Sequence, residues 1–572
     1  MDKSRIRSWA MVTALFGVAF LVRCIALVQL QKSPVGSLIV LDAADYDQWA
    51  VRIARGDWIG KNVFYAMPFY PYFLGVIYFL FGHALSAVRV VQILIGALNC
   101  ALLFGLAKKT FGNVVAVVSG IAYAFLGWAI LYDMMIVSTS LIVLSYLCIL
   151  NLAADHCRNP SKRRIFLIGI ATGISSLIAA NAMVFTAVFA VWIFMSTAKK
   201  SVRRALAFTA LFLAGCALMI APVTVRNYSV AKDFVPVTAH GGLNFYLGNN
   251  TLADGANVNL PFLSSGSSEM ISDSVAYAQR EAGRALKPSQ ISAFWFGKGC
   301  DFIRSHPGRF VELLGIKLRL FFLGYEMADI FSLRFYASPV PLLGIVDIPP
   351  IRLDLIIPLA VIGIMIAMTA RRKDPALATL LIFLGSYIFS VILFLVNTRY
   401  KLPIIPVMIL FAAYAVVEIG KKIKEHRSGA ALAYVAGFLL LYPLLNSARL
   451  YEKYRPNPAG TCVALGCSLL EAGDSVGAIR EFTKAVELEP RRAEAHNMLG
   501  VGFLNAQDAA RAQREFQKAI ELKPGLTAPY NNLAQLYIAK KNYQEALRCL
   551  EKSLALNPNQ PQVQEVAAKL KK

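Results

Sequence analysis

The first long apolar run of the chain is WAMVTALFGVAFLVRCIALVQL, residues 9–30, and it follows the basic residues Lys3, Arg5 and Arg7. A helix of this length is long enough to cross the roughly 30 Å hydrocarbon layer of a bilayer. No small-residue cleavage pattern separates the run from Asp42, so we expect an uncleaved anchor and not a signal peptide. Basic residues collect on the cytoplasmic side of a span, which predicts a cytoplasmic N-terminus.

Working outward from this anchor, the chain continues as a polytopic membrane protein. Hydrophobic residues make up 57% of its 572 residues, more than the roughly half that soluble domains carry. Runs of roughly 17 to 25 apolar residues predict eleven spans, of which the two between 165 and 197 would be short. The predicted spans are 9–30, 86–107, 113–131, 134–152, 165–180, 182–197, 204–222, 353–370, 376–397, 402–419 and 430–447.

The distribution of charge supports this topology. With the spans alternating from a cytoplasmic N-terminus, the inner segments hold 20 basic and four acidic residues, a net charge of +16 out of the formal +24. The outer segments are then 31–85, 223–352 and everything after 447. Because topology explains the basic charge, no nucleic-acid partner is expected.

A soluble segment, 461–572, follows a linker at 451–460 and repeats with a period of 34 residues. In register lie Pro490, Pro524 and Pro558; Gly466, Gly500 and Ala534; and Phe482, Phe516 and Leu550. Small residues that let antiparallel helices approach, with a proline ending each unit, are typical of tetratricopeptide repeats. We expect an α-solenoid of about three repeats, with a capping helix in 559–572. Its concave surface would bind a protein partner; the alternative is a tail that only stabilises or dimerises the rest.

Two carboxylates, Asp42 and Asp45, follow the first span at the membrane–water boundary. With Tyr46 and Trp49 they share a helical face at three- and four-residue spacing. A helix that lies in the headgroup layer and presents carboxylates to water suits chemistry on a lipid-linked substrate. The same residues also fit a helix that only starts at an Asp42 N-cap, so both interpretations stay open.

Short motifs run in order along residues 10–420. They are Asp42 and Tyr46, Gly56-Asp57-Trp58, residues 64–71 (FYAMPFYP), Arg89, Leu131-Tyr132-Asp133, residues 222–228 (PVTVRNY), residues 241–250 (GGLNFYLGNN), Gly324-Tyr325-Glu326 and residues 398–403 (TRYKLP). Together they resemble the GT-C type integral-membrane glycosyltransferases, close to the protein mannosyltransferases and lipid A aminoarabinose transferases. More narrowly, the chain is similar to bacterial family 39 members with a tetratricopeptide tail.

This resemblance implies a GT-C-like, all-α transmembrane domain over 1–450. It also implies transfer of a sugar from a polyprenyl-phosphate donor to a protein or glycolipid acceptor, with inversion at the anomeric carbon. The reaction would occur in the cell envelope, on the outer face of the bacterial inner membrane, where the repeats would also lie. Met67 and residues 178–181 stand where relatives carry basic residues, so the identity of the transferred sugar cannot be inferred from those relatives.

The resemblance also implies roles for the acidic residues. Asp42 matches the catalytic aspartate and would accept the proton of the acceptor hydroxyl, a role worth about 10²- to 10⁴-fold. Asp133 matches the second acidic position, and with Asp45 it would orient the acceptor or bind a divalent cation. Oxygen ligands suit Mg²⁺ or Mn²⁺, with Asp42 and Asp133 as the candidate metal ligands.

The lipid phosphate that leaves needs cations close by. Arginine grips phosphate through paired hydrogen bonds, so Arg226 and Arg399, with Tyr46 and Tyr400, are the candidate donor ligands. Snorkelling to the interface is the alternative for both arginines. Arg23, inside the first span, is expected to snorkel rather than to pair with the acids.

The Gly/Asn-rich run 241–250 is a candidate substrate loop with Gly242, Asn244 and Asn249, whose backbone N–H groups would cradle a sugar or phosphate. A tight surface turn is the alternative. Glu326 matches an acidic position of the family without a derivable role. The nine cysteines show no zinc spacing, and one disulfide among those outside the membrane is left open.

Two other classes of function remain. An O-antigen ligase or polymerase also pairs many spans with an outer repeat domain, but it would carry its chemistry in a late outer loop. The other class is a non-enzymatic channel, flippase or scaffold built around the repeats. Transporters usually place ionisable groups near mid-membrane, and apart from Arg23 the predicted spans are nearly free of them.

Overall fold

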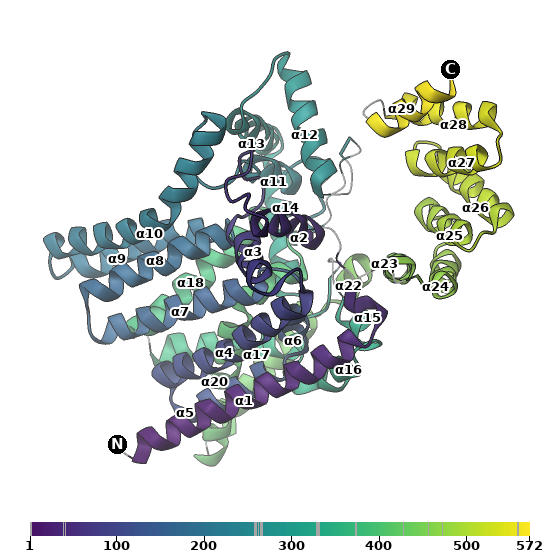
Figure 1. The fold of residues 1–572 in the computed structure, drawn as a ribbon. Coiled ribbons are helices and arrows are strands. Elements are labelled where there is room, and N and C mark those ends of the chain that lie inside the picture. Colours follow the sequence, from purple (N-terminus) through teal and green to yellow (C-terminus); the bar gives the residue numbers. More distant parts are fainter. Residues whose placement is uncertain are drawn as a thin grey trace. The chain divides into compact units, whose positions relative to one another are not determined.

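The computed structural model describes residues 3–37, 39, 42–256, 260, 262–263, 267–327, 332–371, 374–426, 428–455, 457–471, 473–557 and 560–571. Throughout these residues the secondary structure is helical, without a strand, which confirms the all-α prediction (Figure 1). The chain forms two compact units: Met1–Val28 with Ile39–Arg455, and Gln29–Leu38 with Pro456–Lys572. Each unit is described by itself.

In the first unit, eight helical runs of the described residues are long and apolar enough to cross a membrane. They are α1 (Lys3–Gln31), α4 (Leu85–Phe111), α7 (Thr139–Arg158), α10 (Val202–Ala231), α17 (Leu353–Ala370), α18 (Pro375–Ile392), the run Thr398–Lys424 and the run Gly429–Tyr454. The last two contain α20 (Ile405–Lys424) and most of α21 (Ser428–Leu445). The protein is therefore a multi-pass membrane protein.

The remaining predicted spans are helices that fall short of that test. α5 (Asn113–Ala124) and α6 (Gly127–Met134) pass it only together and are bent by 52°. α8 (Lys162–Ile178) and α9 (Ala182–Ala198) have 17 residues each. By length and composition the described residues thus give eight spans, or nine with the bent pair, and the number eleven stays a prediction.

Glycines let two spans of the bundle approach closely. A Cβ on Gly169 of α8 would lie 2.2 Å from the carbonyl oxygen of Phe212 in α10, and one on Gly215 would lie 2.6 Å from that of Phe166. Small residues at such crossings are the usual basis of helix packing in lipid, where the hydrophobic effect between helices is weak. α8 and α10 run side by side in Figure 1.

The first outer segment folds onto the bundle. α2 (Asp42–Ala54) packs along α3 (Phe69–Phe81), and its Ala50 and Ile53 have no exposed surface. Gly75 of α3 has no room for a side chain, because a Cβ there would lie 2.6 Å from Ile53. α3 thus covers Ala50 and Ile53 of this helix, and the location of α2 in the headgroup layer stays a prediction.

Between α10 and η2, the described residues form six helices of 5 to 18 residues. They are α11 (Gly241–Gly248), α12 (Ser267–Ala282), α13 (Pro288–Ser305), α14 (Pro307–Phe322), α15 (Leu333–Ala337) and α16 (Pro341–Val346). α11 packs on α13, with Leu243, Leu247 and Trp295 in their shared core. Short connecting elements are η1 (Pro34–Ser37), η2 (Pro349–Ile351), α19 (Thr398–Lys401), η3 (Leu402–Ile404) and α22 (Ala448–Tyr454).

The second unit contains three antiparallel helix pairs and a last helix. The pairs are α23 (Pro458–Glu471) with α24 (Ser475–Leu488), α25 (Ala493–Asn505) with α26 (Ala509–Leu522), and α27 (Thr527–Ala539) with α28 (Tyr543–Leu556), followed by α29 (Pro561–Leu570). The residues in register pack against each other: a Cβ on Gly466 would lie 2.4 Å from the ring of Phe482, and one on Gly500 would lie 2.6 Å from that of Phe516. Pro558 lies outside the described residues.

Candidate functional site

Asp42 and Arg399, 357 residues apart, form an ion pair between α2 and α19. Asp42 is the first residue of α2, and Arg399 lies on α19, directly before the η3 turn that leads into α20. Nη1 of Arg399 donates to Oδ2 of Asp42 at 2.8 Å. The Asp42 side chain is 32% exposed and the Arg399 side chain 18%, so a substrate in solution or at the membrane surface can reach the pair.

Tyr46 and His240 surround this ion pair. Tyr46 stands one turn along α2 from Asp42, and its ring packs edge-on against Tyr70 at 5.3 Å. Burial first, and then the neighbouring Asp42 carboxylate, raise the pKa of the Tyr46 hydroxyl. It is therefore a neutral hydroxyl that can donate a hydrogen bond at any physiological pH.

His240 precedes α11 and lies within electrostatic reach of Asp42. Burial lowers the pKa of His240 to about 4, and the Asp42 carboxylate opposes that shift in part. Its Nε2 is buried and has no hydrogen-bond partner among the described residues. A neutral imidazole therefore stands beside the candidate catalytic carboxylate.

Arg226 occupies a different place from Arg399. Its guanidinium donates from Nε to the carbonyl of Ile59 at 2.6 Å and from Nη1 to that of Asn62 at 2.7 Å. It also stacks on the ring of Phe64, with its Cζ 3.9 Å from the ring centroid. Arg226 thus ties the loop after α2 to the end of α10, and a phosphate would have to compete with two carbonyl groups for it.

Arg23 forms a buried ion pair with Asp133, so the expectation that it snorkels is wrong. Its Nε lies 2.8 Å from Oδ2 of Asp133, and the two side chains are 0% and 3% exposed. Nη1 donates to the carbonyls of Ala19 and Ala124. Gly96 of α4 makes room for the pair, because a Cβ there would lie 2.0 Å from the Asp133 carboxylate. A carboxylate buried in the bundle is a stronger partner for this arginine than the distant interface.

A chain of contacts joins Asp133 to the α2–α3 layer. The hydroxyl of Tyr70 donates to Gln92 at 2.7 Å, and Nε2 of Gln92 donates to the backbone carbonyls of Asp133 and Met135. Tyr70 and Gln92 thus connect Tyr46 to the backbone of Asp133, whose carboxylate faces Arg23 in the protein interior.

The proposed metal ligands do not fit a divalent cation as they are placed. The carboxylates of Asp42 and Asp133 each lie against a guanidinium, at 2.8 Å in both cases. Among the described residues no group of three or more His, Cys, Asp or Glu side chains is arranged to hold a metal ion. We therefore assign no step of the reaction to a metal.

The Gly/Asn-rich run forms helix α11 and its end, and is neither a cradling loop nor a surface turn. A Cβ on Gly242 would lie 1.8 Å from the carbonyl oxygen of Ser292, so the glycine serves packing against α13. Asn249 is fully buried and donates to the carbonyls of Phe245 and Leu393. Asn244 is exposed on α11, and of these three residues it alone keeps a side chain at the surface.

Three further predicted site residues are Glu326, Tyr400 and Asp45. Glu326 is buried and accepts a hydrogen bond from the Leu333 N–H at 2.8 Å, and burial raises its pKa to about 7. Tyr400 is 40% exposed, and the guanidinium of Arg399 lies 5.4 Å from its ring centroid. Asp45 stands on α2 between Asp42 and Tyr46, with a half-buried side chain. The nine cysteines are free thiols.

Sequence reasoning missed two groups of residues. His240 directly precedes the glycine pair of a matched motif, and that position was the available signal. Asp47 was passed over although it lies in the DAADYD stretch; it accepts from Tyr78 and lies 2.8 Å from Nε2 of His83. No spacing in the sequence links Asp47 to His83, because they are 36 residues apart, Asp47 on α2 and His83 in the connection between α3 and α4.

Comparison with known families matches both parts of the chain. Residues 66–225 match the dolichyl-phosphate-mannose-protein mannosyltransferase family, a little more than a quarter of the chain. Residues 463–527 and 503–570 match two tetratricopeptide-repeat families. No curated protein matches the chain significantly.

Solved structures that resemble this chain include two membrane enzymes and a repeat domain. ArnT from Cupriavidus metallidurans bound to undecaprenyl phosphate is 17% identical, over 90% of this chain and 80% of that chain, with a TM-score of 0.43. The apo oligosaccharyltransferase of Archaeoglobus fulgidus is 13% identical, over 75% and 54%, with a TM-score of 0.41. The first repeat domain of Spaghetti (RPAP3) bound to an HSP90 peptide is 20% identical, over 20% and 93%, with a TM-score of 0.20.

The family matches coincide with the motifs found in the sequence. The chain is thus similar to the protein mannosyltransferases over 66–225 and carries tetratricopeptide repeats over 463–570, which confirms both resemblances drawn from its residues.

Proposed function

We propose that the protein is an integral-membrane glycosyltransferase that moves a sugar from a polyprenyl phosphate to a hydroxyl of a protein or glycolipid acceptor. The observation that carries the proposal is the Asp42–Arg399 pair at 2.8 Å. It combines a carboxylate that can take a proton with a guanidinium that can hold phosphate, and Asp42 precedes the segment 66–225 that matches the mannosyltransferase family.

The reaction needs one proton transfer and one displacement. An oxygen of Asp42 accepts the proton of the acceptor hydroxyl while the oxygen of that hydroxyl forms a bond to the anomeric carbon. The bond between the anomeric carbon and the phosphate oxygen breaks, and its electron pair leaves with the lipid phosphate. Attack on the face opposite the phosphate gives inversion.

Arg399 has a role in both halves of this step. In the structure it holds Asp42, and an arriving phosphate with its larger negative charge would compete for the guanidinium. Movement of Arg399 to the phosphate would release the carboxylate as a base and stabilise the charge that develops on the leaving group. The exposed ring of Tyr400, next to Arg399, offers a surface for the sugar or the first isoprene unit.

We propose the side of the membrane from the predicted spans. Eight candidate spans, the bent α5–α6 pair and the two 17-residue helices together make eleven crossings, and 17 residues is the lower limit for one. With a cytoplasmic N-terminus, Asp42 and the repeats both lie outside, on the outer face of the bacterial inner membrane. The lipid-linked donor would be presented there.

The tetratricopeptide repeats would bind a protein partner. Stacked helix pairs of this kind form concave surfaces that take up peptides or protein segments. We propose that the repeats present the acceptor protein, or a protein that delivers it, to the membrane domain.

The direct test uses the purified full-length protein in lipid nanodiscs. Candidate polyprenyl-phosphate sugars and extracts of envelope proteins and glycolipids are added, and acceptor glycosylation and released polyprenyl phosphate are measured by mass spectrometry. We expect the two products in equal amounts with a lipid-linked donor and none with a nucleotide sugar. Transfer from a nucleotide sugar alone, or no coupling between the two products, would refute the proposal.

A further inference from the structure

A cavity of about 390 Å³ opens where α4, α7 and α18 end or begin, in a part of the bundle that the proposed reaction does not use. Its size is within the range of small-molecule sites, about 300–1,000 Å³. The residues that line it are Lys109, Thr110, Phe111, Gly112, Cys157, Arg158, Arg371, Asp374, Pro375 and Ala376. Three cations and one carboxylate give the lining a net charge of +2.

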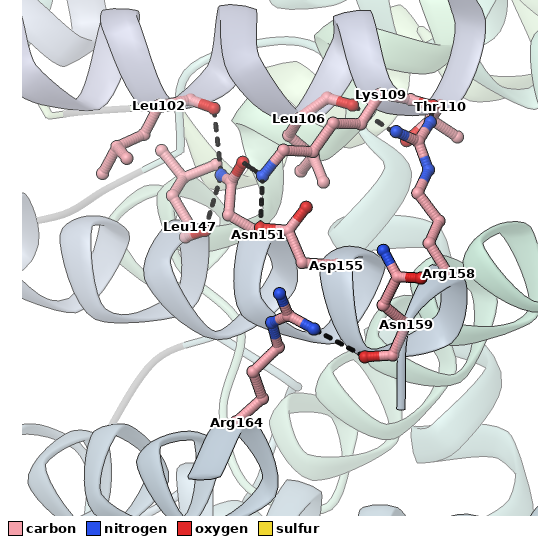
Figure 2. Close-up of polar contacts among 10 residues, drawn as sticks. All are labelled: Leu102, Leu106, Lys109, Thr110, Leu147, Asn151, Asp155, Arg158, Asn159 and Arg164. Atoms are coloured by element: carbon pink, nitrogen blue, oxygen red, sulfur yellow. Dashed lines mark hydrogen bonds and ion pairs between the residues drawn. The ribbon is translucent and has the colours of Figure 1, made fainter. Parts of the chain in front are cut away.

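Each cation is held in place by a neighbouring helix, and Figure 2 shows this for Lys109 and Arg158. Lys109 Nζ donates to Asn151 at 3.1 Å and to Asp155 at 2.9 Å, so α7 fixes the last turn of α4. Arg158, at the end of α7, donates from Nη2 to the carbonyl of Lys109. Arg371, after α17, donates to the carbonyl of Thr110 and lies 3.6 Å from Asp374. The cationic groups are thus ordered around the cavity.

These contacts leave donor capacity for a ligand. A guanidinium carries five N–H donors, and Arg158 uses one of them on the carbonyl of Lys109. A simpler interpretation is that the cations only cover the negative C-terminal end of α4. Capping accounts for the two carbonyls that Arg158 and Arg371 bond, but both arginines also line the cavity, which capping alone does not require.

One helix N-terminus adds to the positive potential. α5 begins at Asn113, and the preceding Gly112 lines the cavity. The first N–H groups of a helix lack partners within it, and they favour a negatively charged ligand. The start of α18 does not contribute in this way, because Pro375 has no N–H and the Ala376 N–H donates to Oδ1 of Asp374 at 2.9 Å.

The cavity lies at the C-terminal end of α4, whereas the candidate site is joined to the other end of that helix through the Tyr70–Gln92 hydrogen bond and the Tyr46–Tyr70 contact. Arg89 bonds the carbonyl of Met134 near the α6–α7 break, and Lys109 stands 20 residues later on the same helix. At about 1.5 Å per residue the two positions are about 30 Å apart, which is the thickness of the hydrocarbon core. The cavity is therefore separate from Asp42 and Arg399.

We propose that this cavity binds a phosphate group, carried by the headgroup of an anionic phospholipid or present as inorganic phosphate. Arginine pairs match the oxygens of phosphate through parallel hydrogen bonds, and basic pockets between span ends are the usual place for anionic headgroups. The site lies where lipid headgroups meet water, and it is independent of the proposed glycosyl transfer.

Cys157 gives a reporter within the cavity. It is a free, partly exposed thiol that lines the cavity, and Cys549 of the second unit is a free thiol of similar exposure that serves as an internal reference. Purified protein in maltoside detergent is alkylated with N-ethylmaleimide, and the modification rate of each cysteine is followed by peptide mass spectrometry. Phosphate, phosphatidylglycerol, phosphatidylcholine or chloride of equal ionic strength is added in parallel.

We expect Cys157 to react about tenfold more slowly when the ligand is at ten times its dissociation constant, while the Cys549 rate is unchanged. Protection by phosphate alone identifies the free anion, and protection by phosphatidylglycerol but not by phosphate identifies the lipid headgroup. Equal Cys157 rates under all four conditions would overturn the proposal.

Variants test the ligands separately. Arg158→Gln and Arg371→Gln should each reduce the protection at least threefold, and Arg203→Gln, an exposed cation at the start of α10, should leave it intact. Native mass spectrometry of the same proteins counts retained phosphatidylglycerol. Full protection and unchanged lipid retention in both cavity variants would also refute the site, and the wild-type comparison stands even if one variant fails to fold.

Discussion

Arg23 and Asp133 lie 2.8 Å apart in the interior of the bundle, and their side chains are 0% and 3% exposed. The pair joins α1 to α6 across Gly96 of α4, which has no room for a Cβ. The resemblance to glycosyltransferases gave Asp133 a part in catalysis, whereas the geometry gives it a buried cation as partner.

Removal of one partner of this pair should destabilise the fold. We expect Asp133→Asn or Arg23→Gln to lower the free energy of unfolding by about 3–5 kcal/mol, because each leaves a buried charge without its counter-charge. The free energy of unfolding should fall less in the double variant Arg23→Met, Asp133→Leu than in either single variant. Thermal unfolding of the purified proteins in detergent measures this, and a stable Asp133→Asn protein without activity would instead favour the catalytic role.

Substitutions of the two candidate phosphate ligands, Arg399 and Arg226, should differ in their effects on activity and stability. Arg399→Gln should lower kcat/KM for the lipid donor by about 10²- to 10³-fold, as loss of one preorganised charge at a leaving group does elsewhere. Arg226→Gln should mainly cost stability, about 1.5–3 kcal/mol, through its bonds to the Ile59 and Asn62 carbonyls. Steady-state kinetics and unfolding midpoints are measured on both. A larger kinetic loss in Arg226→Gln would assign the phosphate to that residue.

His240 should make stability depend on pH. Burial lowers its pKa from 6.5 to about 4, so the unfolded chain takes up a proton first, and stability falls as the pH drops from about 6.5 to 4. The loss is up to about 1.4 kcal/mol per pH unit in that window. Glu326, whose pKa is raised to about 7, acts in the opposite direction, so the difference between wild type and His240→Gln is the quantity to measure.

That difference should shrink below pH 6 and be constant above pH 7. His426→Gln, on an exposed histidine, is the matched control and should follow the wild type at every pH. A constant difference between wild type and His240→Gln from pH 4.5 to 7.5 would show that the imidazole is not held neutral.

Deletion of residues 455–572 should change acceptor use more than donor use. The membrane domain keeps Asp42 and Arg399, so slow hydrolysis of the lipid donor by water should persist, while transfer to the protein acceptor falls. Parallel assays of donor hydrolysis and acceptor glycosylation compare the truncated and full-length proteins. Loss of donor hydrolysis alone would argue against recruitment by the repeats.

Local patterns made much of this fold predictable. The spans follow from apolar length, and the repeats follow from a strict 34-residue period in which Gly466 faces Phe482 and Gly500 faces Phe516. Asp42 stood out because two carboxylates follow a span directly. Each of these features depends on residues close together in the sequence.

Pairings across long separations could not be predicted in the same way. Arg399 meets Asp42 over 357 residues and Arg23 meets Asp133 over 110, and a charge pattern alone does not say which cation faces which acid. The glycines of α11 predicted a loop because glycine favours turns, but Gly242 allows close packing on α13 and Gly248 allows close approach to the backbone of Phe394. Burial of α2 against α3 likewise depends on a partner helix that no local pattern identifies.

The central claim is that Asp42 is the base of sugar transfer, and Asp42→Asn tests it most directly. With a polyprenyl-phosphate donor and a cognate acceptor, we predict that the rate of transfer falls by about 10²- to 10⁴-fold while the unfolding midpoint is unchanged. Asp301→Asn, on an exposed carboxylate of α13, should retain full turnover. Turnover of Asp42→Asn equal to that of the wild type would contradict the account.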